Sequence, residues 1–398
     1  MKNNVLSMFP YYGGKARMAP LICDMLDYEH TDIFVTPFGG ACRVLLNKPR
    51  HNGLEIYNDL SLGLCTFVKL MSDPATAHEL IDRIYETEYS QVQFDWALNY
   101  RNSVDDNLIK QTLKEWNQFL KQLLIKNLVI DNSVEPGEWR RIVCNPVDAM
   151  KKCNMSLDET HEANRLLNNC KVARDAMRQE EHLDMPDNWV EIDDMDLAVA
   201  TYVVYMQSRD AMGQSWSNSK FKTQEQYYKQ MARLYDVADR LQGVEVYNIN
   251  AMQFFRHYYD EGFLDSLDSA SDDEIKNGYR LMNKWLTNPR VIMCCDPSYI
   301  SPEDEAKIIQ KRKQGKVNKQ PKNLGTPYKA SFTYEDHEAF LKAICHAQCR
   351  VIVSNYDLIL YNNYLNSDNG WKRIEFETKT SVGGKQDNRR TEVLWYNY

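Results

Sequence analysis

The arrangement of short apolar runs restricts the folds open to this chain more than any other feature. Five such runs, separated by stretches long enough for helices, cover residues 33–36, 54–58, 244–248, 290–295 and 350–354. Continuously apolar strands with helical connections are typical of a parallel sheet buried between two layers of helices. Two further strands, near 372–378 and 391–397, flank the hairpin signal Ser381-Val382-Gly383-Gly384. We therefore predict a doubly wound α/β fold whose mainly parallel, seven-stranded sheet ends in an antiparallel hairpin.

The stretch between the second and third apolar runs is long enough to form a domain of its own. Leucine and aromatic side chains recur there at helical spacing, for example at Leu113 and Leu120. We predict that residues 1–75 and 244–398 form one domain and that residues 76–243 form a mostly helical inserted domain. A chain of 398 residues is long enough for both.

Composition and the N-terminus narrow the class of protein. Mean hydropathy is −0.59 and no apolar run reaches about 18 residues, so a membrane span is not expected. No apolar signal region follows Met1, and we expect a cytoplasmic protein. The ten cysteines lie mostly in apolar surroundings, which indicates reduced core thiols. Cys345, His346 and Cys349 lack a second ligand pair at zinc-site spacing, and we expect no metal.

The apolar run Val291–Cys295 ends in the sequence Asp296-Pro297-Ser298-Tyr299, here called the D-P-S-Y tip. Such a strand delivers a carboxylate, a backbone carbonyl and an aromatic ring to the edge of a sheet. A planar amine that donates to both Asp296 and the Pro297 carbonyl would move toward tetrahedral geometry and become a better nucleophile. Tyr299 would stack on the ring that carries the amine. A strand end followed by an ordinary turn is the alternative interpretation.

Two glycine-containing segments predict a site for a nucleoside. The first is Phe9-Pro10-Tyr11-Tyr12-Gly13-Gly14-Lys15, and the second, Thr36-Pro37-Phe38-Gly39-Gly40, follows a predicted strand. A glycine turn after a strand lets backbone approach a ligand closely. Neither segment fits a phosphate-binding loop, which favours a nucleoside without phosphates. The next strand ends at Asp59, where doubly wound folds place a carboxylate against ribose hydroxyls.

Taken together, these segments resemble the Dam-like group of adenine-N6 DNA methyltransferases, which use S-adenosylmethionine. Family members carry F-x-x-x-G-G-K, then P-F-x-G-x-G, then an N-D or A-D strand end, and later D-P-P-Y. This chain has counterparts of all four in the same order. The resemblance continues at 332–341, 351–355 and 391–398. It covers residues 1–75 and 240–398, and the middle of the chain only loosely.

The resemblance implies a cofactor and a set of residues around it. The cofactor is S-adenosylmethionine and the product S-adenosylhomocysteine, with no metal. The residues implied at the cofactor are Tyr11, Gly13, Gly14, Lys15, Phe38, Gly39, Gly40, Asp59, Asn250 and Asp296. The catalytic residues implied are Asp296, Pro297, Ser298 and Tyr299. A C-terminal antiparallel pair and a target-recognition domain inserted between the second and third strands are also features of this family.

Some positions depart from the family pattern. Ser298 replaces the second proline of D-P-P-Y, which loosens the turn while keeping the Asp296 carboxylate, and we expect activity to survive. Asn250 stands where an Asp is usual but can still donate and accept hydrogen bonds. Cys42 replaces a smaller residue. Pro10 stands where GATC-reading relatives carry a lysine, so GATC specificity does not transfer.

Basic residues are concentrated in segments suited to DNA phosphates, although the formal net charge of the chain is −8. The stretch from Ala306 to Tyr334 contains many lysines and no acid, and we predict a flexible basic loop there. Residues 206–222 combine glycine, serine, asparagine, basic and aromatic residues, which suit phosphate and base contacts. Solvated loops without a partner are the alternative. The predicted DNA contacts are Arg209, Ser217, Lys220, Lys311, Arg312 and Lys313.

We therefore expect a site-specific DNA adenine-N6 methyltransferase that acts on an adenine flipped from double-stranded DNA. A catalytically weakened DNA- or cofactor-binding protein, and an amine methyltransferase acting on RNA or protein, remain alternatives. The target sequence is open, and so is a role in restriction-modification beside a cognate restriction endonuclease.

Overall fold

The computed structural model describes the chain in separate segments. The described residues are 5–127, 153, 159, 193–209, 211–255, 285–314, 332–379 and 389–398. The chain divides into two compact units, which are Met1–Arg101 with Ile192–Arg256 and Met282–Tyr398, and Asn102–Glu191 with His257–Leu281. The first unit contains the whole sheet and all the predicted site residues.

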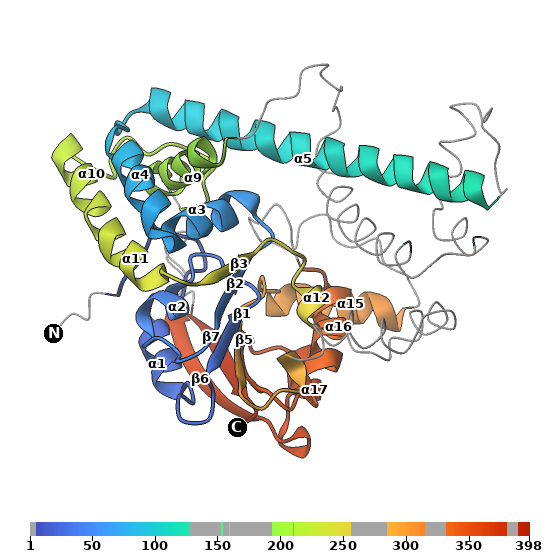
Figure 1. The fold of residues 1–398 in the computed structure, drawn as a ribbon. Helices are drawn as coiled ribbons and strands as arrows, with labels where there is room; N and C mark the ends of the chain where they lie inside the picture. Colours follow the sequence, from blue (N-terminus) through green and yellow to red (C-terminus); the bar gives the residue numbers. More distant parts are fainter. Residues whose placement is uncertain are drawn as a thin grey trace. The chain divides into compact units, whose positions relative to one another are not determined.

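A mixed sheet of seven strands forms the centre of the first unit (Figure 1). The strands are β1 (Ile33–Thr36), β2 (Glu55–Asn58), β3 (Glu245–Tyr247), β4 (Val291–Cys295), β5 (Arg350–Tyr356), β6 (Lys372–Lys379) and β7 (Arg389–Tyr396). Their order is β3-β2-β1-β4-β5-β7-β6. Neighbours from β3 to β5 are parallel, whereas β7 is antiparallel to both β5 and β6. The predicted seven-stranded α/β sheet is confirmed, and the predicted turn at 381–384 lies outside the described residues.

Both faces of β1 and β4 are buried, which explains why their sequences are apolar as far as Val35 and Cys295. Successive side chains of a strand point to opposite faces. Phe34 and Ile292 accordingly pack in one apolar cluster, and their neighbours Val35 and Met293 pack in another. The sheet therefore separates two layers of core.

Helices cover both layers. The first cluster includes residues of α1 (Ala19–Met25), α2 (Arg43–Asn47), α3 (Leu62–Ser72), α4 (Pro74–Tyr85), α5 (Gln91–Lys126), α9 (Asp194–Gln207), α10 (Gln224–Met231) and α11 (Arg233–Leu241). The second includes residues of α12 (Met252–Phe255), α15 (Pro302–Lys313), α16 (Tyr334–Ile344) and α17 (Ile359–Tyr364). Every residue of α9 from Leu197 to Gln207 is buried, as expected of a helix enclosed on all sides.

Helix α15 corrects one prediction. The basic stretch was expected to be a loop from Ala306 onward, but its first part is helical up to Lys313. Ser301 caps the helix by accepting a hydrogen bond from the Asp304 amide, and a proline follows directly. Acidic residues occupy the first turn and basic residues the last, which suits the helix dipole. These local signals outweigh the basic composition, and residues 315–331 lie outside the described part.

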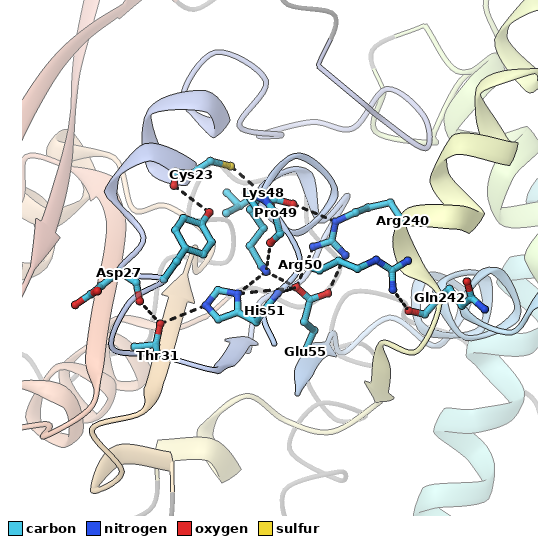
Figure 2. Close-up of polar contacts among 12 residues, drawn as sticks. Cys23, Asp27, Thr31, Lys48, Pro49, Arg50, His51, Glu55, Arg240 and Gln242 are labelled. Carbon is cyan, nitrogen blue, oxygen red and sulfur yellow. Dashed lines mark hydrogen bonds and ion pairs between the residues drawn. The ribbon is translucent and has the colours of Figure 1, made fainter. Parts of the chain in front are cut away.

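A cluster of charged side chains is buried at the amino end of β2 (Figure 2). Glu55, the first residue of β2, accepts hydrogen bonds from Lys48 and from Arg240 of α11, the latter at 2.8 and 3.0 Å. The Lys48 residue is only 2% exposed. Arg50 donates to backbone carbonyls of Asp239 and Gln242, where α11 ends. The cluster therefore fastens the connection between β1 and β2 to α11.

His51 makes the stability of this cluster depend on pH. Its Nδ1 lies 2.7 Å from Lys48 Nζ, and burial together with that lysine lowers the pKa of His51 to about 4. The unfolded chain takes up a proton near pH 6.5 that the folded protein does not. The free energy of unfolding should therefore fall by about 3 kcal/mol between pH 6.5 and 4 because of this residue. Denaturant unfolding at several pH values should show a flatter profile for His51→Gln, and an unchanged profile would contradict this assignment.

Candidate active site

The carboxyl ends of neighbouring strands bring the predicted catalytic and cofactor residues to one edge of the sheet. Strands β2, β1, β4 and β5 are adjacent and parallel, so the residues that follow them lie along the same edge. Gly39 follows β1, Asp59 follows β2 and Asp296 follows β4. Lys15 joins this edge from the N-terminal segment through an ion pair with Asp296.

Asp296 is held by two groups from distant parts of the chain. Because Cys295 pairs with Val353, the next residues, Asp296 and Ser354, are neighbours. The Ser354 hydroxyl donates to Asp296 Oδ1 at 2.7 Å, and Lys15 Nζ lies 2.9 Å from the same oxygen. The Asp296 side chain is 28% exposed. The carboxylate is therefore fixed in orientation and still open to a ligand.

Tyr299 lies beside this carboxylate. Lys15 Nζ is 4.3 Å from the centre of the Tyr299 ring, which is a cation–π contact. Tyr356 packs against the same ring edge-on, with centroids 4.9 Å apart. Burial and the nearby Asp296 raise the pKa of Tyr299, so the phenol is neutral. An ammonium group thus rests on an aromatic ring and against a carboxylate at the same time.

Ser298 gives the D-P-S-Y tip an attachment that proline lacks. Its hydroxyl accepts a hydrogen bond from the Phe332 amide at 2.9 Å. Phe332 lies just before α16 and packs edge-on against Phe38, with centroids 5.2 Å apart. The expected loosening of the turn is thus opposed by a tether between the tip and the segment that leads into α16.

The turn after β1 needs its glycines for different reasons. A Cβ on Gly39 would lie 2.1 Å from an atom of the Tyr57 ring, so only glycine fits there. Gly40 adopts a φ of +48°, which favours glycine. Cys42 keeps a left-handed φ of +41° although it is not a glycine, a conformation that strains an L-residue. The turn is therefore shaped by close packing on Tyr57 of β2.

Asp59 is tied to the glycine turn. Its Oδ2 accepts a hydrogen bond from the Gly40 amide and its Oδ1 one from the Ser61 amide, both at 2.8 Å. Burial raises the pKa of this carboxyl, and the amide hydrogen bonds oppose that shift. Two large side chains with apolar surface are exposed at the carboxyl ends of β2 and β3. Leu60, which follows β2, is 40% exposed, and Tyr247, the last residue of β3, is 39% exposed.

The N-terminal segment folds back on this turn. The Gly14 amide donates to the Tyr11 carbonyl at 3.1 Å, and Gly13 adopts a φ of +73°. The ring of Tyr11 would lie 3.2 Å from a Cβ on Gly40. Phe38, in contrast, packs into the second apolar cluster, where its ring stacks on Phe255 with centroids 6.0 Å apart.

Asn250 lies between β3 and the short helix α12, two residues before the helix begins. Its Oδ1 accepts a hydrogen bond from the Met252 amide at 2.9 Å. Asn248, two residues earlier, donates to the Asp59 and Leu60 carbonyls at 2.9 and 3.1 Å. The segment after β3 is thus joined to the segment after β2.

The predicted DNA contacts fall into two groups. Arg209, Lys311 and Lys313 are exposed. Arg312 pairs with Glu335 and Glu338 of α16 at 3.1 and 3.2 Å. Lys220 Nζ donates to the carbonyls of Tyr205 and Ser208, near the end of α9, at 3.4 and 3.0 Å. Ser217 is buried, and its carbonyl accepts a hydrogen bond from the Tyr89 hydroxyl.

Two residues with positioning roles were missed by sequence reasoning. Ser354 holds Asp296, as described above. Asn58, fully buried, donates to the carbonyls of Pro37 and Ile249 at 2.8 and 3.0 Å and accepts from the Ile249 amide at 3.0 Å. Both are polar residues at the end of an apolar run, the same signal that identified Asp296.

The mixed α/β fold is compatible with a methyltransferase fold, and comparison with known families shows one similarity. Residues 11–132 match the family of D12 class N6 adenine-specific DNA methyltransferases. The match confirms the resemblance to Dam-like adenine methyltransferases. It includes the glycine turn and Asp59, while the D-P-S-Y tip lies beyond it. A search of curated proteins finds no match to this chain.

Two further observations on the described residues concern membrane-spanning helices and metal-binding groups. None of the helices in those residues has both the length and the apolar character needed to cross a membrane. Within the same residues, His, Cys, Asp and Glu side chains form no group of three or more able to hold a metal ion.

Proposed function

We propose that this protein transfers a methyl group from S-adenosylmethionine to N6 of an adenine flipped out of double-stranded DNA. One observation carries the proposal. The Lys15 ammonium lies 2.9 Å from Asp296 Oδ1 and 4.3 Å from the centre of the Tyr299 ring. An N–H donor is therefore already bound where a stacked base would present its exocyclic amine, and the matching family acts on that amine.

The residues of the D-P-S-Y tip would bind and orient the amine. A flipped adenine would displace the Lys15 ammonium, stack on Tyr299 and donate one N–H to Asp296 and the other to the Pro297 carbonyl. That pairing draws the nitrogen lone pair out of the ring and aims it away from the carboxylate. Flipping costs a few kcal/mol, and stacking on Tyr299 would return about 1 to 3 kcal/mol of it.

The glycine turn and Asp59 fit the nucleoside part of S-adenosylmethionine. When bound, this cofactor would supply an electrophilic methyl group. The Asp59 carboxylate accepts from the amides of Gly40 and Ser61 and also interacts with that of Leu60, and its two oxygens together have four lone pairs, so one remains for a ribose hydroxyl. The exposed Leu60 and Tyr247 offer apolar surface for a purine ring. The remaining cofactor contacts we propose are with Tyr11, Gly13, Gly14, Lys15, Phe38, Gly39, Gly40, Asn250 and Asp296.

For the DNA, Arg209, Lys311 and Lys313 are the strongest candidates because their side chains are exposed. Lys220 and Arg312 would have to exchange present partners for phosphates, and Ser217 would have to leave a buried position. We further propose that the helical residues within 76–243 supply target recognition.

The direct test is methyl transfer from tritiated S-adenosylmethionine to unmethylated genomic DNA, with RNA and a protein extract as parallel acceptors. Label in DNA, found as N6-methyladenine on sequencing, would support the proposal and reveal the recognition sequence. Label only in RNA or in protein would refute it in favour of the corresponding alternative. Cofactor binding without transfer to any acceptor would indicate a binding protein.

Tyr299→Ala should weaken capture of the flipped base. Loss of the stacking surface should raise the DNA concentration needed for half-maximal rate by about 5- to 150-fold, equivalent to about 1 to 3 kcal/mol. The matched control is Tyr235→Ala, which removes an exposed tyrosine of α11. Fluorescence of 2-aminopurine at the target position reports base capture directly. A Tyr299→Ala signal equal to that of the control would count against the stacking role.

A further inference from the structure

Three polar side chains are completely buried behind the D-P-S-Y tip, and the proposed chemistry does not use them. They are Asn355 at the end of β5, His337 in α16 and Tyr361 in α17, each 0% exposed. Asn355 Nδ2 donates to Tyr361 Oη at 2.9 Å, and Tyr361 Oη lies 2.7 Å from His337 Nδ1. Buried polar groups destabilise a fold unless they are paired, and these three side chains are paired with one another. Their burial therefore suggests a role beyond packing.

The order of donors in this chain can be assigned. Asn355 Oδ1 accepts from the Tyr356 amide at 2.8 Å, which fixes the amide orientation and directs Nδ2 toward Tyr361. The Tyr361 oxygen receives that N–H, so its own O–H donates to His337 Nδ1. Burial lowers the pKa of His337 to about 3, so the imidazole is neutral and its proton is on Nε2.

The imidazole lies close to the backbone of Ser298 in the D-P-S-Y tip. His337 Nε2 is buried and makes no hydrogen bond to the described residues, while the nearby backbone of Ser298 opposes the lowering of the His337 pKa that burial causes. The ring also packs edge-on against Phe332, with centroids 4.9 Å apart. The Phe332 amide donates to the Ser298 hydroxyl at 2.9 Å. Ser298 is thus contacted by the Phe332 amide at its hydroxyl and lies beside the His337 ring through its backbone.

We propose that His337 and Tyr361 are positioning residues for methyl transfer, which hold the Ser298 backbone so that Asp296 and the Pro297 carbonyl keep a fixed spacing. The inference rests on the proposed function. In this proposal the hydrogen-bonded residues Asn355, Tyr361 and His337 support Ser298. Ser354 separately holds the Asp296 carboxylate. A small displacement of the tip would misalign the adenine amine with the methyl group, although every group that contacts the amine would still be present.

The test compares variants in single-turnover methyl transfer at saturating cofactor and DNA. Tyr361→Phe removes only the hydroxyl, and His337→Leu removes both nitrogens. Each should slow the transfer step by about 10- to 100-fold, with the affinity for S-adenosylmethionine unchanged. His337→Gln keeps one acceptor and one donor and should restore most of the rate.

Tyr28→Phe is the matched control, because it deletes a hydroxyl that donates to the Cys23 carbonyl at 3.0 Å from a ring that packs against His51. It should leave the transfer rate unchanged. Wild-type rates in Tyr361→Phe and His337→Leu, or equal losses in Tyr361→Phe and Tyr28→Phe, would overturn the inference. A wild-type protein that methylates no DNA would instead refute the proposed function.

A second measurement does not depend on turnover. Imidazole ¹⁵N chemical shifts should show His337 as the neutral tautomer with the proton on Nε2. In Tyr361→Phe the donor to Nδ1 is lost, and the Nδ1 shift should move toward that of a free acceptor. A proton on Nδ1 in the wild-type protein would contradict the donor order and with it the support of Ser298.

Discussion

The Asp296→Ala variant should fold and transfer methyl groups to DNA at least about 100-fold more slowly at saturating S-adenosylmethionine. The carboxylate is the group that would accept the amine N–H, and Ser354 and Lys15 fix it at 2.7 and 2.9 Å. An alanine leaves the flipped base stacked but its lone pair delocalised in the ring. Single-turnover transfer of tritiated methyl groups measures the effect.

Asp368→Ala is the control for this experiment, since it removes an exposed carboxylate in the short helix η1 (Ser367–Asn369). It should retain the full rate. Retention of more than a tenth of the wild-type rate by Asp296→Ala would remove Asp296 from its proposed role. A wild-type transfer step combined with a large loss of cofactor affinity in that variant would assign the carboxylate to the cofactor alone.

Glu55→Ala should cause the largest loss of stability, about 3 to 5 kcal/mol in the free energy of unfolding. Glu55 is the buried carboxylate that pairs with both Lys48 and Arg240 and also accepts from the His51 amide at 3.0 Å. Without it, buried positive charges remain unpaired, and desolvation is no longer offset. Urea unfolding at pH 7 measures the change.

An exposed ion pair provides the comparison. Glu225 and Lys229 of α10 lie 2.8 Å apart and are both well exposed, so Glu225→Gln should leave the unfolding midpoint unchanged. Glu55→Gln keeps the volume of the side chain and separates the loss of charge from the loss of packing. A midpoint for Glu55→Gln equal to that of the wild type would mean that the buried carboxylate does not stabilise the fold.

Local pattern was sufficient for the strands of this protein. A strand buried on both faces is mostly apolar, and such runs stand out between polar helical segments. The runs ending at Thr36, Asn58 and Cys295 therefore predicted β1, β2 and β4. Together with the runs at 244–248 and 350–354 and the hairpin strands near 372–378 and 391–397, they predicted the seven-stranded sheet. The prediction that residues after these runs form a site followed from the same pattern. Helix α15 replaces the first part of the predicted basic loop because the cap at Ser301 and the charges at the two helix ends favour a helix there.

The partners of Asp296 could not be predicted, because they depend on which strands lie side by side. Strand order is set by packing between distant segments, and β4 lies between β1 and β5 although it is far from both in the chain. Only that order brings Ser354 to the carboxylate, and only the folding back of the N-terminal segment brings Lys15 there. The sequence alone therefore identified the chemical groups of the site. Their distances and orientations arise from long-range packing on the two faces of the sheet.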